Sequence, residues 1–360
     1  MGTAGEPDGD LDASDITLVE LRPSRWKILV RVLLLVVSAG VLYGLLPSLL
    51  AVVAEAPRLL DLNPVWFVAM LGFEAASFAC VWWLTRIAVP GVSWFVASTS
   101  QLASNAVSRI VPGGPAIGTA IGWRMLSVSG VDRARAGTAI AATSFISNGV
   151  LFAIPLVAVL GSIFGAPVPH SLSLVAWGGA LVFVVLFAAA FTVVRFDRPL
   201  RLVGRTVERV GRWLYGRLGR SNRPTEAGLI HHRNLVVSAL GSRWEQALAA
   251  AVGKWLLDYL ALVAALFAVG ASPRLSLVLL AYGAGAVLGM IPITPGGLGF
   301  VEAGLTTTLA FAGITGEQAL LATLAYRIAS YWLPLPAGLA AWIAFRHRYG
   351  TPPLVSTDPR

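Results

Sequence analysis

Six long apolar runs constrain the fold of this chain more than any other feature of its sequence. They are Ile28–Leu46, Pro64–Val89, Gly137–Leu160, Ser173–Val194, Ala247–Val269 and Gln318–Phe345. An apolar run of about 18 or more residues with few charges is long enough to cross a bilayer as a helix. Only 12% of the 360 residues are charged, about half the level usual in soluble proteins. The sequence therefore predicts an all-α, polytopic membrane helix bundle, and it excludes a cytosolic enzyme, a secreted domain and a fibrous protein.

Two further apolar stretches, Trp94–Leu126 and Leu275–Ala312, are each interrupted near the middle by Pro-Gly-Gly. Proline removes a backbone donor and glycine disfavours the helix, so a continuous helix cannot run through either break. Each stretch is expected to form two half-helices with an unwound tip, either as a re-entrant hairpin or as a broken crossing pair. The predicted fold class is about six full spans plus two broken hairpins.

The two breaks indicate an internal repeat. Pro112-Gly113-Gly114 and Pro295-Gly296-Gly297 are 183 residues apart, and Pro90 and Pro273 have the same separation. The first copy contains three full spans and a hairpin, an odd number of crossings, so the second copy is expected to enter the membrane upside down. The first hairpin would then enter from the cytoplasm and the second from outside. Inverted repeats with paired Gly/Pro-interrupted segments are typical of alternating-access transporters.

The distribution of charge sets the predicted topology. Segment 195–243 contains eleven arginines, whereas loop 161–172 contains no Asp, Glu, Lys or Arg. Positive charge gathers in cytoplasmic loops, so we expect both termini to be cytoplasmic in a multi-pass protein of the cell membrane. The predicted parts are a disordered acidic tail (1–25), a first repeat (26–160), an external loop (161–172), an inverted second repeat (173–346) with a basic amphipathic cytoplasmic segment (195–243), and a cytoplasmic tail (347–360). The net charge of +9 is expected to face anionic lipid and not nucleic acid.

Ionisable residues within the apolar segments are candidate functional groups, because charge inside a membrane is costly and faces a cavity or a partner. Glu74, Lys254 and Asp258 form one set. Lys254 and Asp258 stand four residues apart on one predicted helix and could simply neutralise each other; the alternative is a role in proton exchange. Glu74 and Asp258 occupy nearly equivalent places in the two copies.

A second set is predicted to bind substrate. Half-helix ends present free amides that suit a phosphate, and arginine donates hydrogen bonds to phosphate in pairs. Glu302 could cap its own helix or bind a proton or a cationic headgroup, and Arg109 could belong to the site or only reach the cytoplasmic surface. The predicted substrate-binding residues are Pro112, Gly113, Gly114, Arg124, Pro295, Gly296, Gly297, Gly299, Glu302 and Arg327.

Motifs of nucleotide-binding, hydrolytic and metalloprotease enzymes are absent from the sequence. No enzymatic activity, cofactor or metal is therefore expected. His231 and His232 have no carboxylate or cysteine at metal-ligand spacing. The lone cysteine, Cys80, excludes an intramolecular disulfide.

At Pro295-Gly-Gly-Leu-Gly-Phe-Val-Glu302, at Arg327 and at Pro112-Gly-Gly-Pro115 followed by Arg124, the chain resembles the flippase-like transmembrane region of lysylphosphatidylglycerol synthases, the multiple-peptide-resistance-factor type. The likeness extends from about Trp26 to Arg346. It implies a bundle of roughly eight helices that moves or presents a lipid between leaflets. Nothing in the chain corresponds to the soluble synthase domain of the full-length relatives, so we expect the stand-alone form.

Two functions remain open at this point. The first is a flippase-like transporter of a phospholipid or a polyprenyl-phosphate-linked lipid. The second is a non-transporting membrane partner or scaffold for a lipid-modifying enzyme or a glycosyltransferase. The expected partners are membrane lipids, either an anionic or aminoacylated phospholipid or a polyprenyl phosphate, with a homo-oligomer or a membrane enzyme as a further possibility and no nucleic acid.

Overall fold

The structure, a computed structural model, describes residues 56–60, 62–111, 114–164, 177–178, 181, 184–185, 188, 241–290 and 295–350. All of these residues belong to one unit, Val41–Arg360; the other unit, Met1–Gly40, lies outside the described residues. So do the first apolar run, most of the fourth, the external loop, the basic segment up to residue 240 and the end of the C-terminal tail. The helices and helical turns are α2 (Ala56–Leu60), α3 (Pro64–Ala88), α4 (Trp94–Ile110), α5 (Gly114–Val128), α6 (Arg133–Phe164), η1 (Gly241–Arg243), α10 (Trp244–Ala268), α11 (Leu275–Leu288), η2 (Pro295–Gly297), α12 (Phe300–Phe311), α13 (Gly316–Arg327), η3 (Ile328–Trp332) and α14 (Pro334–Tyr349).

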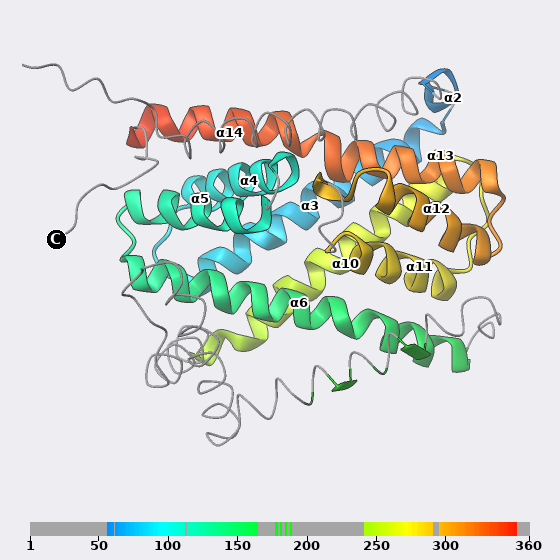
Figure 1. Ribbon diagram of the computed structural model, residues 1–360, viewed down its shortest axis with the longest axis horizontal. Coiled ribbons are helices and arrows are strands. Elements are labelled where there is room, and N and C mark those ends of the chain that lie inside the picture. Colours follow the sequence, from blue (N-terminus) through cyan, green and yellow to red (C-terminus); the bar gives the residue numbers. More distant parts are fainter. Residues whose placement is uncertain are drawn as a thin grey trace, which may run out of the picture. The chain divides into compact units, whose positions relative to one another are not determined.

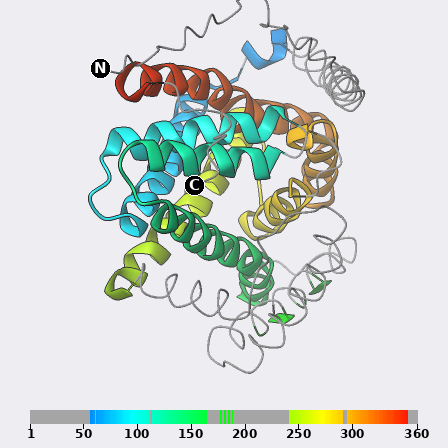
Figure 2. The same cartoon turned by 60° about the vertical axis from the view of Figure 1, so that its left-hand side comes forward.

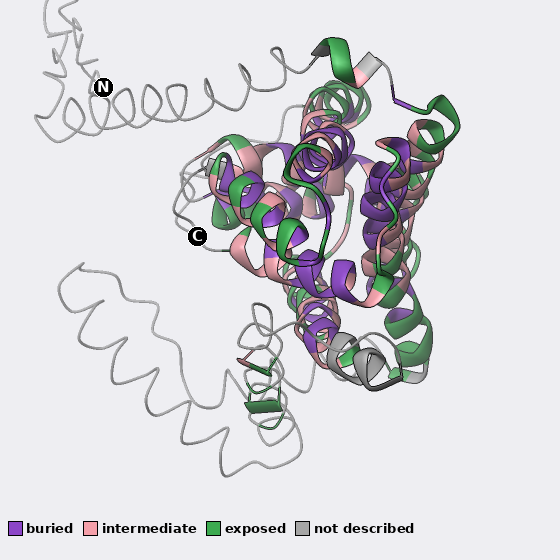
Figure 3. Ribbon diagram, turned by 90° about the vertical axis from the view of Figure 1, so that its right-hand side faces the viewer, coloured by how far each residue is buried: buried purple, intermediate pink, exposed green. Residues whose placement is uncertain are grey.

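The all-helical membrane fold is confirmed. Four segments of the described part are long and apolar enough to cross a membrane: Pro64–Ala88, Arg133–Val157, Trp244–Ala268 and Gly316–Tyr349. They correspond to four of the six predicted spans. Large apolar side chains such as Val68 and Leu256 are exposed on them, as expected where lipid replaces water around a helix. Figure 3 shows buried residues on the inner faces of the bundle and exposed ones on its outside.

Helices α3 and α10 form the spine of the bundle. They pack against each other and lie between α14 on one side and α6 on the other (Figures 1 and 2). Small buried residues of α10, Ala247, Ala250 and Ala251, cluster with Leu84 and Ile87 of α3. Small side chains let two helix backbones approach closely in a membrane, where association depends on van der Waals packing.

The first broken stretch is a hairpin, because α4 and α5 pack side by side. Three glycines of α5 at four-residue spacing face α4: a Cβ on Gly114 would strike the backbone of Ser108, one on Gly118 would strike Ser104 and Ser108, and one on Gly122 would strike Ser104. Residue numbers rise along one helix as they fall along the other, so the two half-helices are antiparallel.

The second broken stretch folds in the same way. Gly285 of α11 faces Leu305 of α12, and Gly304 of α12 faces Leu288 of α11, again antiparallel. Between them Gly296 has a φ of 61° and Gly297 a φ of 71°, in the left-handed region that only glycine adopts readily. The prediction of two half-helices at each Pro-Gly-Gly is confirmed, and in both cases the stretch forms a hairpin.

The last predicted span is divided where a single helix was expected. Helix α13 passes into a π-helical turn, η3, in which the amide of Leu333 donates to the carbonyl of Ile328, five residues back. Pro334 follows and has no N–H, so the carbonyl of Ser330 receives no bond from the residue four positions later. Proline thus leaves a free backbone acceptor in the middle of this span, at a turn of a kind often found at functional sites.

Two contacts join the halves of the chain. Helix α14 packs against α4, and α6 packs against α11. Under the predicted 183-residue repeat, α4 corresponds to α11 and α6 to α13–α14, so the two contacts join corresponding pairs of elements.

Candidate functional site

A polar cavity of about 180 Å³ lies between helices from the two halves of the chain. The residues that line it come from α3, α4, α10, α13 and η3: Glu74, Ser77, Phe78, Val81, Gln101, Asn105, Arg109, Lys254, Asp258, Tyr326, Arg327 and Ser330. Five of these twelve side chains are ionisable, two of them acidic and three basic. Because isolated charges are costly inside a membrane, a cavity this rich in them is a candidate functional site.

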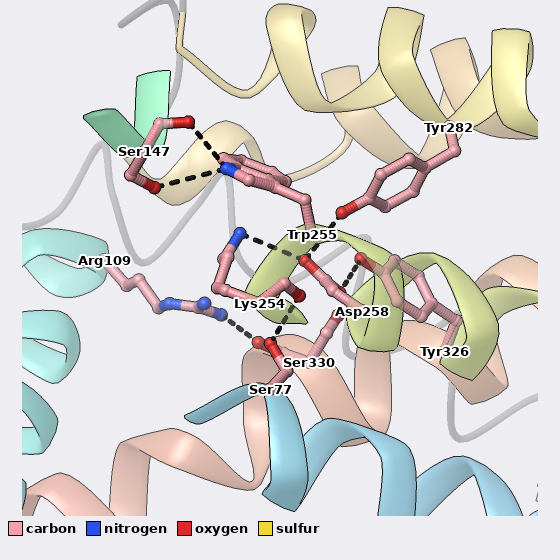
Figure 4. Close-up of polar contacts among 9 residues, drawn as sticks. All are labelled: Ser77, Arg109, Ser147, Lys254, Trp255, Asp258, Tyr282, Tyr326 and Ser330. Carbon is pink, nitrogen blue, oxygen red and sulfur yellow. Dashed lines mark hydrogen bonds and ion pairs between the residues drawn. The ribbon is translucent and has the colours of Figure 1, made fainter. Parts of the chain in front are cut away.

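Asp258 is the most fully hydrogen-bonded charge in the cavity. Its Oδ2 lies 3.3 Å from Lys254 Nζ and accepts a 2.9 Å hydrogen bond from the Tyr282 hydroxyl, while its Oδ1 accepts a 2.7 Å bond from the Tyr326 hydroxyl. Figure 4 shows the three donors converging on this carboxylate from α10, α11 and α13. Lys254 and Asp258 do form an ion pair, and two tyrosines hold the carboxylate in place.

Glu74 has a different environment in the same cavity. It reaches the cavity from α3 and is 7% exposed. Among the described residues no hydrogen-bond partner faces its Oε2, and the same holds for Oδ1 of Asn105. Buried polar atoms are nearly always paired, so these two acceptors are positioned to accept hydrogen bonds from a molecule or a proton that enters the cavity.

Arg109 belongs to the site and does not simply reach the surface. Its Nη1 donates a short hydrogen bond to the Ser330 carbonyl, the acceptor that Pro334 leaves free. Its guanidinium carbon lies 5.0 Å from the centre of the Tyr331 ring, within cation–π range. In return the Tyr331 hydroxyl donates a 3.1 Å hydrogen bond to the backbone carbonyl of Arg109. The end of α4 is therefore tied to the turn η3.

Arg327 forms an ion pair with Glu302. The sequence analysis had placed both residues in the predicted substrate site. Arg327 Nε donates a 2.6 Å hydrogen bond to Glu302 Oε1, and Nη2 donates a 3.3 Å bond to the carbonyl of Gly296 in the second glycine-rich tip. Glu302 stands in the first turn of α12 and is not among the residues that line the cavity. It therefore lies behind Arg327 and holds that guanidinium in position.

Tyr331 brings the two broken hairpins together. Its ring lies beside both guanidinium groups, 5.0 Å from Arg109 and 4.4 Å from Arg327, and its edge fills the space that a Cβ on Gly296 would need. Helix α4, which leads into the first Pro-Gly-Gly, also contacts η2, which contains the second. The end of α4 and the second Pro-Gly-Gly thus lie on either side of Tyr331, beside the cavity.

The predicted site residues divide into two groups. Glu74, Lys254, Asp258 and Arg327 line the cavity, and Glu302 and Gly296 contact Arg327. Four more predicted residues are described and do not line it: Gly114, Arg124, Gly297 and Gly299. The side chain of Pro295 is not described. Pro112 and Gly113 lie outside the described residues.

Several residues of the site were not predicted. Tyr282, Tyr326 and Tyr331 had no role in the sequence analysis, and neither did Ser77 or Asn105. A signal was present for two of them, because Tyr326 and Tyr331 flank Arg327 in an apolar segment, where polar side chains need partners. Within the described residues no three side chains of His, Cys, Asp or Glu come together as a metal site requires.

Comparison with known proteins identifies the kind of chain that contains this cavity. The family described as "Lysylphosphatidylglycerol synthase TM region" matches residues 19–338. A "UPF0104 membrane protein" of Methanothermobacter thermautotrophicus is 37% identical over 94 residues, which are 26% of this chain. The chain covers 27% of that relative's length. Both matches are to membrane proteins, in agreement with the helical bundle.

Proposed function

Because this chain belongs to the lysylphosphatidylglycerol synthase transmembrane region family, we propose that it is a carrier that moves a phosphate-bearing lipid between the leaflets of the cell membrane, with both termini in the cytoplasm. The observation that supports this proposal is the cavity lined by ionisable side chains from both halves of the chain, beside the contact between α4 and the second Pro-Gly-Gly. Discontinuous helices at a repeat interface are where secondary transporters bind their substrates.

The cationic side chains of the cavity suit a phosphate group. Arg109, Lys254 and Arg327 all line it. The hydrogen bonds described above use Nη1 of Arg109 and Nε and Nη2 of Arg327, whereas a guanidinium has five N–H donors. Each arginine thus keeps donors for phosphate oxygens, and planar paired donation makes arginine a strong phosphate ligand.

The cavity size limits what part of the lipid enters. A volume of about 180 Å³ holds a phosphate-sized group and a few waters, since one water occupies about 30 Å³ of liquid. The acyl or prenyl chains therefore stay in the bilayer while the headgroup passes through the protein. In this mechanism the hairpins open the cavity to one leaflet and then to the other, and Tyr331 contacts Arg109 at the end of α4 and Gly296 of the second Pro-Gly-Gly in the state seen here.

A reconstitution experiment tests the proposal. Liposomes containing the purified full chain and a phosphatidylglycerol labelled with a fluorophore on a short acyl chain are assayed by albumin back-extraction, which counts the label left in the outer leaflet. Arg109→Gln removes a cavity cation, and Arg274→Gln removes an exposed arginine as the matched control. Losing a charge-assisted hydrogen bond worth about 1.5–3 kcal/mol predicts about a tenfold or greater loss of rate for the first variant and less than a twofold change for the control.

Two outcomes would contradict the carrier. Equal rates for Arg109→Gln and Arg274→Gln would mean that the cavity takes no part in the movement. If the wild-type protein moves no lipid but co-purifies with a membrane enzyme in a fixed ratio, the scaffold function is favoured instead.

A further inference from the structure

We propose that Glu74 binds and releases one proton for each anionic headgroup carried, which makes the protein a symporter of lipid and proton. This inference rests on the proposed function and adds its driving force. It depends on three features of the cavity: the unequal hydrogen bonding of its two carboxylates, the balance of its charges and the lack of ligands for a larger cation among the described residues that line it.

The two carboxylates that line the cavity are hydrogen-bonded to different extents. Asp258 receives Lys254 Nζ and two tyrosine hydroxyls, at 3.3, 2.9 and 2.7 Å. Such a set of donors fixes a carboxylate in its charged form. Glu74 is 7% exposed and its Oε2 has no partner among the described residues. A carboxylate oxygen that is buried, lines a cavity and has no donor is the one that gains most from binding a proton.

The groups around Glu74 define the charge balance. The titratable side chains that share its cavity are Lys254 and Asp258 of α10, Arg109 of α4, and Tyr326 and Arg327 of α13. Tyr282 of α11 stands behind Asp258, and the arginines at the start of α6, Arg133 and Arg135, are exposed. Glu302 offsets Arg327 at 2.6 Å. When Glu74 is ionised, Arg109 and Lys254 balance Glu74 and Asp258, and the charges of the described residues that line the cavity, taken together with Glu302, sum to zero.

An anionic phosphodiester disturbs this balance by one negative charge. If Glu74 takes up a proton, its carboxylate becomes a neutral carboxylic acid and the cavity returns to neutrality. Charge imbalance is expensive at low dielectric, so each ligand favours the binding of the other, as reciprocal coupling requires. One monoanionic headgroup and one proton then cross together with no net charge, and no oxidant or reductant is needed.

The same geometry disfavours a metal cation in place of the proton. Three cationic side chains line the cavity and would repel a sodium ion. A sodium ion also needs several oxygen ligands. Among the described residues that line this cavity, the unpaired buried side-chain acceptors are two, Glu74 Oε2 and Asn105 Oδ1, which is too few. A proton on Glu74 instead supplies an O–H donor to an environment that already contains acceptors.

The test measures coupling in liposomes containing the full chain and the short-chain fluorescent phosphatidylglycerol. A gradient of about one pH unit, acidic outside, is expected to concentrate the label in the inner leaflet by up to about tenfold for one proton per lipid. Potassium and valinomycin, which set the membrane potential, are expected to leave this accumulation unchanged because the movement is electroneutral. A dye that reports internal pH is expected to show acidification only when the lipid is present.

Glu74→Gln fixes the side chain in a neutral form. We expect this variant to move the lipid down its own gradient with no response to the pH gradient, whereas Glu245→Gln, on an exposed glutamate at the start of α10, is expected to behave as the wild type. Glu74→Asp, which keeps a titratable group, is expected to retain the pH response if Glu74→Gln does not fold.

The outcomes separate the two proposals. Wild-type movement of lipid with no response to the pH gradient and no internal acidification overturns the proton coupling and leaves the carrier intact. Accumulation driven by a sodium gradient at equal pH overturns it in favour of a metal cation. No movement of lipid under any condition overturns both proposals.

Discussion

The buried ion pair of Arg327 and Glu302 is expected to matter strongly for the stability of the fold, so that a change of either residue alone lowers it. The two residues are 8% and 9% exposed, and Nε and Oε1 are 2.6 Å apart. Breaking a buried pair leaves one charge uncompensated and costs about 3–5 kcal/mol, whereas replacing both partners costs much less. We therefore expect Arg327→Gln and Glu302→Gln each to lower the thermal unfolding temperature in detergent more than the double variant does. Additive losses in this double-mutant cycle would show that the pair is not coupled.

The tyrosine donors of Asp258 lead to a second prediction. Tyr326→Phe removes a 2.7 Å hydrogen bond to a buried carboxylate while it keeps the ring. A hydrogen bond to a charged group contributes about 1.5–3 kcal/mol, so the free energy of unfolding should fall by that amount. Tyr349→Phe, whose ring stacks on Phe345 near the end of α14, serves as the control and should change it by less than about 0.5 kcal/mol. Equal effects of the two changes would contradict the Asp258 network.

At the scale of elements, the same substitution is expected to have opposite effects at two helix glycines, one in the first hairpin and one in α6. A Cβ on Gly114 would collide with the backbone of Ser108, whereas one on Gly149 of α6 would meet nothing within 4 Å. Overpacking against fixed backbone costs about 1–3 kcal/mol, and alanine is the better helix former where space is open. Gly114→Ala should therefore destabilise the protein, and Gly149→Ala should be neutral or slightly stabilising.

Gly122 provides an internal check on this account. The nearest atom to its added Cβ is the Oγ of Ser104, a side-chain atom, at 2.5 Å. Ser104→Ala removes that atom, so the double variant Gly122→Ala, Ser104→Ala should recover most of the stability lost by Gly122→Ala alone. If thermal unfolding shows no recovery, α4 and α5 do not pack in this register.

The elements differ in how well the sequence predicts them. Both hairpins follow from local chemistry, because proline and two glycines break a helix wherever they occur in an apolar stretch. The position of Arg109 does not follow, since its partner is the carbonyl of Ser330, 221 residues away. The carbonyl of Ser330 lacks its usual helical partner because residue 334, four positions later, is proline. The packing of α14 against α4 then brings this carbonyl to Arg109. Long-range contacts of this kind leave no periodic signal in the sequence.

At the scale of the whole molecule, the structure distinguishes a spine from the parts placed around it. Helices α3 and α10 pack closely through small residues, whereas the tip of the second hairpin contains glycines with positive φ, Gly296, Gly297 and Gly299. Regions of few contacts and irregular backbone open at lower free energy than packed helices. We therefore expect the tips to move during transport while α3 and α10 stay together.

The lone native cysteine allows this division to be tested with one substitution. Cys80 of α3 faces Gly253 of α10, and a Cβ on Gly253 would lie 3.9 Å from the Cβ of Cys80, close to the separation of about 3.8 Å in disulfides. Gly253→Cys should therefore form an intramolecular disulfide on oxidation, seen as a reducible mobility shift on a gel. With the spine fixed, lipid movement in liposomes should be equal in the oxidised and reduced protein. A rate that falls on oxidation and returns with a reductant would place the transport motion between α3 and α10, and failure of the disulfide to form would contradict their packing.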